Sequence, residues 1–143
     1  MDDETKNYII EKFGRIHPVF EHMEKYNPEI LKGFITIRKA TLPPKGGSSL
    51  VPEKMKELII IAVEVALGRG EKGKSHARRA VRLGATPQEV HEAVSLVIWL
   101  AGWATYVDGG MDAVKAAEDE YEKMLKGEPF FWTQEVPSDK KTH

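Results

Sequence analysis

The strongest constraint on the fold is the segment 57–67, in which only Glu57 and Glu64 are not apolar. As a helix it is apolar around most of its circumference, so we expect it at the centre of the molecule. Glu57 would be drawn inside with it, and a carboxylate in an apolar setting is unstable unless it is paired or used. His76 follows a glycine-rich break at 68–73 and is the nearest candidate partner, so we expect any chemistry at this pair.

Helical signals continue along the whole chain. Apolar residues recur at helical rather than alternating spacing, and strand signals are nearly absent. The run TPQE at 86–89 has the composition of a capping box, and Gly14 and Gly84 are typical helix ends. The fold class is therefore predicted to be all-α, with six or seven helices at about 3–13, 17–26, 28–41, 52–67, 74–83, 90–104 and 107–125.

The domain organisation is expected to be simple. The 143 residues are enough for one domain with a substantial core, and we expect a single helical domain over residues 1–126. An irregular C-terminal tail is predicted over 127–143. Phe130, Phe131 and Trp132 in this tail are too apolar to stay in water, so we expect the tail to pack on the domain or on a neighbouring subunit.

Composition excludes several classes of function. The formal net charge of -1 gives no bulk attraction to nucleic acid or to an anionic membrane. The chain has no cysteine, which excludes disulfides, thiolate nucleophiles and cysteine-based zinc sites. The N-terminus has no signal-peptide core, and the longest apolar stretch, 93–104, is too short to span a bilayer. We therefore expect a cytoplasmic protein without nucleic-acid or membrane partners.

Four segments in fixed order resemble the carboxymuconolactone decarboxylase family, which also contains the alkylhydroperoxidase D proteins. They read KELI at 56–59, SHARRA at 75–80, GATPQEVHEA at 84–93 and LAGW at 100–103. The similarity covers roughly residues 50–124. It implies an alkylhydroperoxidase D-like helical bundle that forms a homo-oligomer, commonly a trimer or a hexamer, with sites near subunit contacts.

The same resemblance separates two branches of the family. The peroxidase branch carries a glutamate, a Cys-x-x-Cys pair and a histidine, which fall here on Glu57, on Arg69 and Lys72, and on His76. Because the chain has no thiol to oxidise, it is not expected to be a thiol peroxidase. It is similar instead to the decarboxylase branch, which lacks the cysteine pair and keeps the histidine.

The candidate site residues follow from these patterns. His76 is the expected catalytic acid and Glu57 the residue that orients it or handles a second proton, because histidine can give or take a proton near neutral pH. Arg69 and Lys72 precede the predicted helix 74–83, where they could hold a carboxylate substrate, and Trp103 is the best candidate for a pocket wall. No metal site is expected.

Each assignment has a structural alternative. Glu57 could be a first-turn residue stabilised by the helix dipole, the basic residues could serve solubility alone, and Trp103 could belong to the core or an interface. His17, His22 and His91 show no metal-ligand spacing and are expected to be surface or structural residues. Salt bridges are expected from three further residues, Arg78, Arg79 and Arg82.

Two classes of function therefore remain open. The first is a cofactor-free lyase that acts by proton transfer on a small carboxylated lactone or cyclic acid. The second is a non-catalytic oligomer that binds a ligand or partner in the same pocket. A peroxidase that depends on external thiols is the least favoured. The expected partners are a second copy of the chain and a small anionic substrate, with no cofactor.

Overall fold

The computed structural model describes residues 1–133, and these residues form helices and loops without strands, which confirms the predicted all-α class. Within them are eight helices: α1 (Asp3–Phe13), α2 (Pro18–Tyr26), α3 (Pro28–Thr41), α4 (Glu53–Ala66), α5 (Gly70–Arg82), α6 (Pro87–Ser95), α7 (Val97–Ala101) and α8 (Trp103–Leu125). Because only Leu96 separates α6 from α7, the two form one bent element, so the count agrees with the predicted six or seven.

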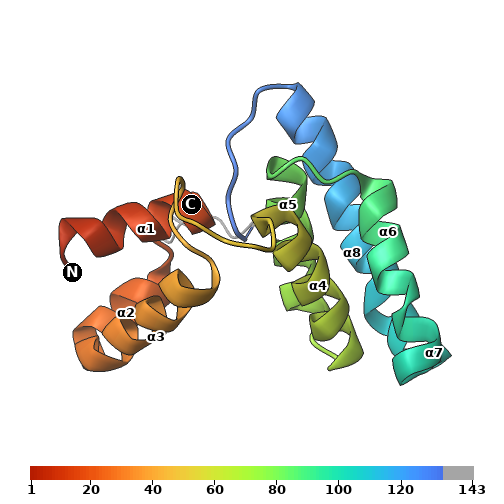
Figure 1. Ribbon diagram of the computed structural model, residues 1–143, viewed down its shortest axis with the longest axis horizontal. Helices are drawn as coiled ribbons and strands as arrows, with labels where there is room; N and C mark the ends of the chain where they lie inside the picture. Colours follow the sequence, from red (N-terminus) through yellow and green to blue (C-terminus); the bar gives the residue numbers. More distant parts are fainter. Residues whose placement is uncertain (134–143) are drawn as a thin grey trace, which may run out of the picture.

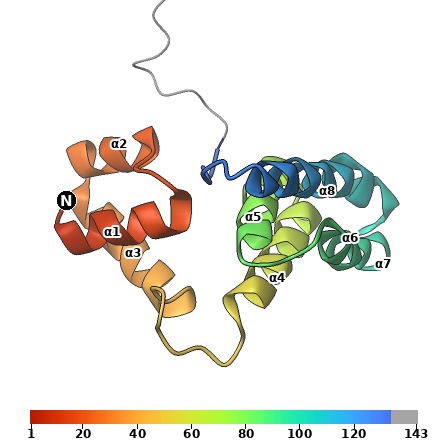
Figure 2. The same ribbon diagram turned by 90° about the horizontal axis from the view of Figure 1, so that it is seen from above.

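The helices form two groups, each with its own buried apolar cluster (Figures 1 and 2). The first group, α1–α3, buries a cluster that contains Phe13, Phe20 and Leu31. The second group, α4–α8, buries a larger cluster. The loop from 42 to 52 connects the groups, and the segment after α8 returns between them (Figure 1). The site described below lies where the two groups meet.

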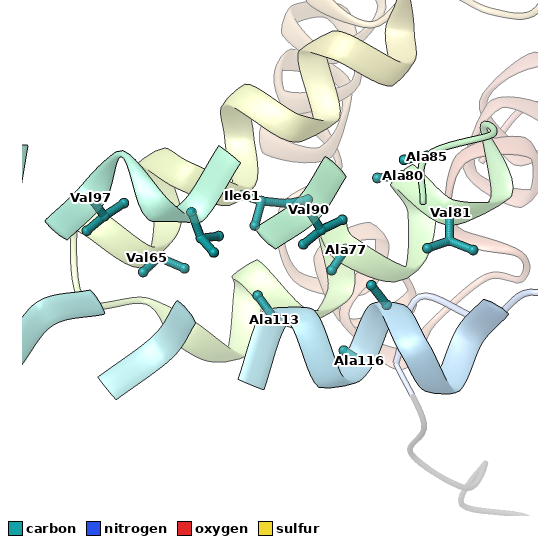
Figure 3. Packing of buried hydrophobic residues seen from close by; sticks show 12 residues of the cluster. Ile61, Val65, Ala77, Ala80, Val81, Ala85, Val90, Val97, Ala113 and Ala116 are labelled. Atoms are coloured by element: carbon teal, nitrogen blue, oxygen red, sulfur yellow. The ribbon is translucent and has the colours of Figure 1, made fainter. Parts of the chain in front are cut away.

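Small residues hold the second group together (Figure 3). Ala77 of α5 and Ala113 of α8 are completely buried, and Ile61 and Val65 of α4 and Val90 of α6 fill the space around them. Alanine has almost no side chain to separate two helices, so α5 and α8 lie close together along their length. The helix that carries His76, α5, is therefore packed closely against α8.

Helix ends agree with the local signals. The side chain of Thr86 caps α6 by accepting a hydrogen bond from the backbone N–H of Glu89. The Glu89 carboxylate in turn accepts a hydrogen bond from the backbone N–H of Thr86. This confirms the predicted capping box. Gly14 ends α1 and Gly84 follows α5, both with the positive φ that favours glycine.

Several predicted boundaries were wrong. α5 begins at Gly70 rather than Lys74, because the glycines inside the expected break serve helix packing: a Cβ on Gly70 would lie 3.3 Å from the Cα of Gly109. The predicted helix 90–104 instead ends at Ser95, and α8 begins at Trp103 and runs straight through Gly109.

The expectation that α4 is central holds for only one of its faces. Its buried stripe consists of Glu57, Ile61 and Val65, which all face the bundle. The opposite stripe is exposed in the single chain and is apolar, consisting of Met55, Ile59, Val63 and Leu67.

The predicted tail, 127–143, is described as far as Thr133, and its part at 134–143 lies outside the described residues. The described part is irregular. The backbone N–H of Trp132 donates to the Phe13 carbonyl at 3.0 Å, and the Trp132 ring joins the cluster of the first group. The chain therefore returns to its own first helix before it leaves the described region.

None of the helices within residues 1–133 combines the length and the apolar character that crossing a membrane would require.

Candidate active site

Glu57 and His76 meet between α4 and α5. Glu57 lies on the buried stripe of α4, four residues before Ile61, so its carboxylate is carried into the contact with α5. His76 Nδ1 lies 2.6 Å from Glu57 Oε2. Glu57 is 1% exposed and His76 8% exposed, so water scarcely reaches the pair.

This contact sets the tautomer of the imidazole. An ionised carboxylate can only accept hydrogen bonds, so Nδ1 carries the proton and donates it to Glu57. Nε2 lies on the other side of the ring and has no hydrogen-bond partner within residues 1–133.

His76 lines a cavity of about 560 Å³ between the two helical groups. The first group supplies most of the wall, α5 supplies Lys72 and His76, and the returning segment supplies Trp132 and Thr133. The Trp132 ring meets the His76 ring nearly at a right angle, with 4.5 Å between the centroids. The wall is mostly apolar, with Pro18, Val19, Phe20, Met23 and Phe34 among its members.

Arg38 is a cavity residue that the sequence analysis missed. It follows Leu31 and Ile35, the buried residues of α3, at positions i+7 and i+3. That spacing places all three on one helix face, and this was the signal that could have found it. Its guanidinium carbon lies 4.5 Å from the centroid of Phe13.

His17 also lines the cavity and is only 5% exposed. Its Nε2 lies 3.1 Å from the carbonyl of Phe13, the last residue of α1. This hydrogen bond ties the turn between α1 and α2, which agrees with the structural role expected for His17. His22 and His91 are exposed, as expected.

The structure separates the residues expected to bind substrate. Lys72 lines the cavity together with His76. Arg69 instead forms an ion pair with Glu64 at 2.9 Å. Trp103 is 66% exposed, its ring neighbours that of Tyr106, and it is not part of the cavity wall.

Of the three arginines expected in salt bridges, Arg79 and Arg82 form them within the described residues, and Arg78 contacts the returning segment instead. Arg79 pairs with Glu53 at 3.4 Å and Arg82 with Glu120 at 3.1 Å. Arg78 donates to the carbonyl of Trp132 at 3.0 Å, and burial lowers the pKa of its guanidinium. Arg78 thereby fixes the returning segment against α5, close to His76.

No group of three His, Asp or Glu side chains that could hold a metal ion is found in the described part of the chain. The polar side chains that line the cavity include those of two histidines, one arginine, one lysine and one threonine, and of the histidines His76 is paired with a carboxylate. These groups suit acid–base chemistry and anion binding.

The protein is of the all-helical class in which two adjacent helices, here α4 and α5, bring together a buried glutamate and a histidine. A comparison with known families assigns the family. The model of the carboxymuconolactone decarboxylase family matches residues 28–119. The match covers more than half of the chain, so the chain belongs to this family.

A solved structure shares the fold. It is a crystal structure of a Burkholderia xenovorans LB400 protein that carries the provisional name carboxymuconolactone decarboxylase. The TM-score is 0.76, the sequence identity is 22%, and the similarity covers 87% of this chain and 92% of that chain. At this identity the likeness establishes the fold alone. None of the curated proteins matches the chain.

Proposed function

We propose that this protein is a cofactor-free lyase that removes carbon dioxide from a small carboxylated lactone or cyclic acid. The observation that carries the proposal is the buried Glu57–His76 pair at the wall of a mostly apolar cavity. Membership of the carboxymuconolactone decarboxylase family supports the choice of reaction.

The reaction needs one proton and a place for one electron pair. When the bond to the carboxylate carbon breaks, carbon dioxide leaves and its bonding electrons move into the conjugated ring carbonyl, which becomes an enolate. The imidazolium of His76 then delivers its Nε2 proton to the carbon that lost the carboxylate. His76 ends neutral and regains a proton from water, and the hydroxide that this leaves combines with the released carbon dioxide to form bicarbonate, so atoms and charge balance.

Glu57 and Lys72 have supporting roles in this scheme. Glu57 holds the ring orientation and stabilises the imidazolium, because its carboxylate lies 2.6 Å from Nδ1. Lys72 would stabilise the anionic substrate and the enolate from the cavity wall. The proposal gives no substrate contact to Arg69 or Trp103, since neither lines the cavity.

The experiment is a carbon dioxide release assay with carboxymuconolactone and a panel of carboxylated lactones and cyclic keto acids. Loss of a positioned acid typically lowers the rate about a hundred- to ten-thousand-fold, which is the decrease expected for His76→Ala. His91→Ala is the matched control, because His91 is exposed and distant from the cavity wall. Unchanged release in His76→Ala would reject the mechanism. Tight binding without release from any compound would favour the non-catalytic ligand-binding protein.

We also propose that the chain assembles with copies of itself, as a trimer or a hexamer. The support is the apolar surface that the single chain exposes on α4 and around α7, which includes Ile59, Trp99, Leu100 and Trp103. An exposed apolar area of this kind is typical of an interface. The cytoplasmic location expected from the sequence stays a prediction.

A further inference from the structure

Arg38 is held in the cavity wall by aromatic rings, and the proposed proton transfer does not use it. Its guanidinium carbon lies 4.5 Å from the ring centroid of Phe13, 5.8 Å from that of Phe34 and 5.9 Å from that of Trp132. Aromatic faces attract a cation and limit its motion. The guanidinium is therefore a positioned positive charge rather than a mobile surface group.

The hydrogen-bonding capacity of this guanidinium is not used up. It contacts the hydroxyl of Tyr8, but its Nε and Nη2 atoms are buried without a hydrogen-bond partner in the described region. No ion pair formed within residues 1–133 includes Arg38. Buried donors without an acceptor are destabilising and rare, so a ligand that supplies two acceptor oxygens would satisfy them.

The rest of the wall favours an anion with a flat, apolar body. The residues that line the cavity include two cations, Arg38 and Lys72, and no Asp or Glu. Its volume of about 560 Å³ is within the usual range for small-molecule sites. A carboxylate matches the two-pronged geometry of a guanidinium, which makes it the best chemical fit for the orphan donors.

The three rings around the guanidinium differ in exposure. Phe13 is 4% exposed and Trp132 7%, whereas Phe34 is 37% exposed. Phe34 is thus the ring that can move aside to admit a carboxylate. His76 and Arg38 both contact Trp132, so a small molecule that lies along this indole reaches both of them.

We propose that Arg38 binds a carboxylate that the substrate keeps, while the group that reacts lies at His76. An arginine that held the departing carboxylate would stabilise the ground state as much as the transition state and would not speed its loss. The substrate therefore carries a second, unreactive carboxylate. The assignment of the retained group rests on the proposed function, whereas carboxylate binding at Arg38 does not.

The test measures binding without turnover, by isothermal titration calorimetry of the full chain with two probes of equal shape. Benzoate has a flat apolar ring and a carboxylate, and benzamide has the same ring without the charge. Wild type should bind benzoate at least about tenfold more tightly, which corresponds to the lower end of a charged hydrogen bond. Equal affinity for the two probes would overturn the proposal.

Variants assign the preference to Arg38. Arg38→Gln should lose the preference for benzoate, and Arg38→Lys should keep part of it, because lysine retains the charge without the fork. Lys39→Gln is the matched control, since it removes one charge from the same helix at a residue that pairs with Glu4 on the surface. Wild-type preference in Arg38→Gln would overturn the proposal.

A second measurement covers the case in which Arg38→Gln does not fold. The Nε–H resonance of Arg38, assigned by its absence in Arg38→Lys, should shift with benzoate and not with benzamide; an unmoved resonance overturns the proposal. The two proposals fail separately. If Arg38→Gln loses the preference for benzoate but no compound is decarboxylated, the carboxylate site stands and the lyase is rejected. If a compound is decarboxylated but Arg38→Gln keeps the preference, only the carboxylate site is rejected.

Discussion

At the scale of single residues, Glu57 is the group on which the proposed chemistry of His76 depends. Glu57 is 1% exposed and its carboxylate lies 2.6 Å from Nδ1 of His76, so the imidazole replaces water as its hydrogen-bond partner. Removing one member of a buried pair is destabilising, but an amide of nearly the same shape keeps a hydrogen bond to Nδ1 and removes only the charge. An amide at position 57 therefore separates two cases: a purely structural pair would lose stability but not turnover, and a functional pair would lose turnover.

Glu57→Gln provides this distinction. The amide can still accept a hydrogen bond from Nδ1 but cannot stabilise an imidazolium by charge, so turnover should fall about ten- to a hundredfold. The melting temperature should change far less than for a residue whose only role is packing. Glu64→Gln is the matched control, because Glu64 lies on the same helix and pairs with Arg69 away from the cavity. Loss of stability with normal turnover would make the pair purely structural.

At the scale of elements, sequence reasoning succeeded where the signal is local. The cap at Thr86 and the end of α1 at Gly14 depend on residues within one turn. The start of α5 at Gly70 was misplaced because the role of this glycine depends on Gly109 of a partner helix, about forty positions away in the sequence, which local composition does not reveal.

The candidate site shows the same division. The Glu57–His76 contact could be anticipated because both residues lie on neighbouring helices and one of them had to be paired. Trp132 reaches His76 only because the end of the chain returns to α1, and no local pattern predicts that return. Arg38 could have been found from the spacing of α3.

The capping box of α6 predicts a pH dependence of stability. A hydrogen bond from Lys54, followed by that from the backbone of Thr86, lowers the pKa of Glu89 from its usual 4.5. A carboxyl with a lowered folded-state pKa stabilises the fold at neutral pH, and this contribution is lost as the pH falls through the lowered pKa. Wild type should therefore exceed Glu89→Gln in free energy of unfolding at pH 7, with the difference vanishing in acid. Denaturant titrations of both proteins from pH 7 down to acid pH measure this difference in free energy of unfolding. A difference that grows toward acid would contradict the stabilising role given to the Glu89 carboxylate.

At the scale of the whole molecule, the cavity and the exposed apolar surface are formed by different parts of the chain. The cavity is closed by residues of one chain, from α1–α3, α5 and the returning segment. The exposed apolar residues of α4 and α7 are not among those that line the cavity. The proposed catalysis at His76 and the proposed assembly through α7 therefore use different residues and can be altered separately.

The assembly prediction follows from this separation. Light scattering of the purified chain should give a multiple of its 16.1 kDa mass, and Trp99→Glu should lower it, because a charge at an apolar interface opposes association. Thr36→Glu, at an exposed polar residue of α3 in the first group, should leave the mass unchanged. A wild-type chain that stays at 16.1 kDa at high concentration would reject self-assembly.

We propose that His76 delivers a proton to carbon, and the position of that proton in the product can be measured. Decarboxylation in D₂O should give a product with one deuterium at the carbon that lost the carboxylate, on a single face as read by NMR. His76→Ala should form this product about a hundredfold more slowly or not at all, and His91→Ala at the normal rate. Deuterium on one face at the wild-type rate in His76→Ala would show that another group supplies the proton, and would contradict the account.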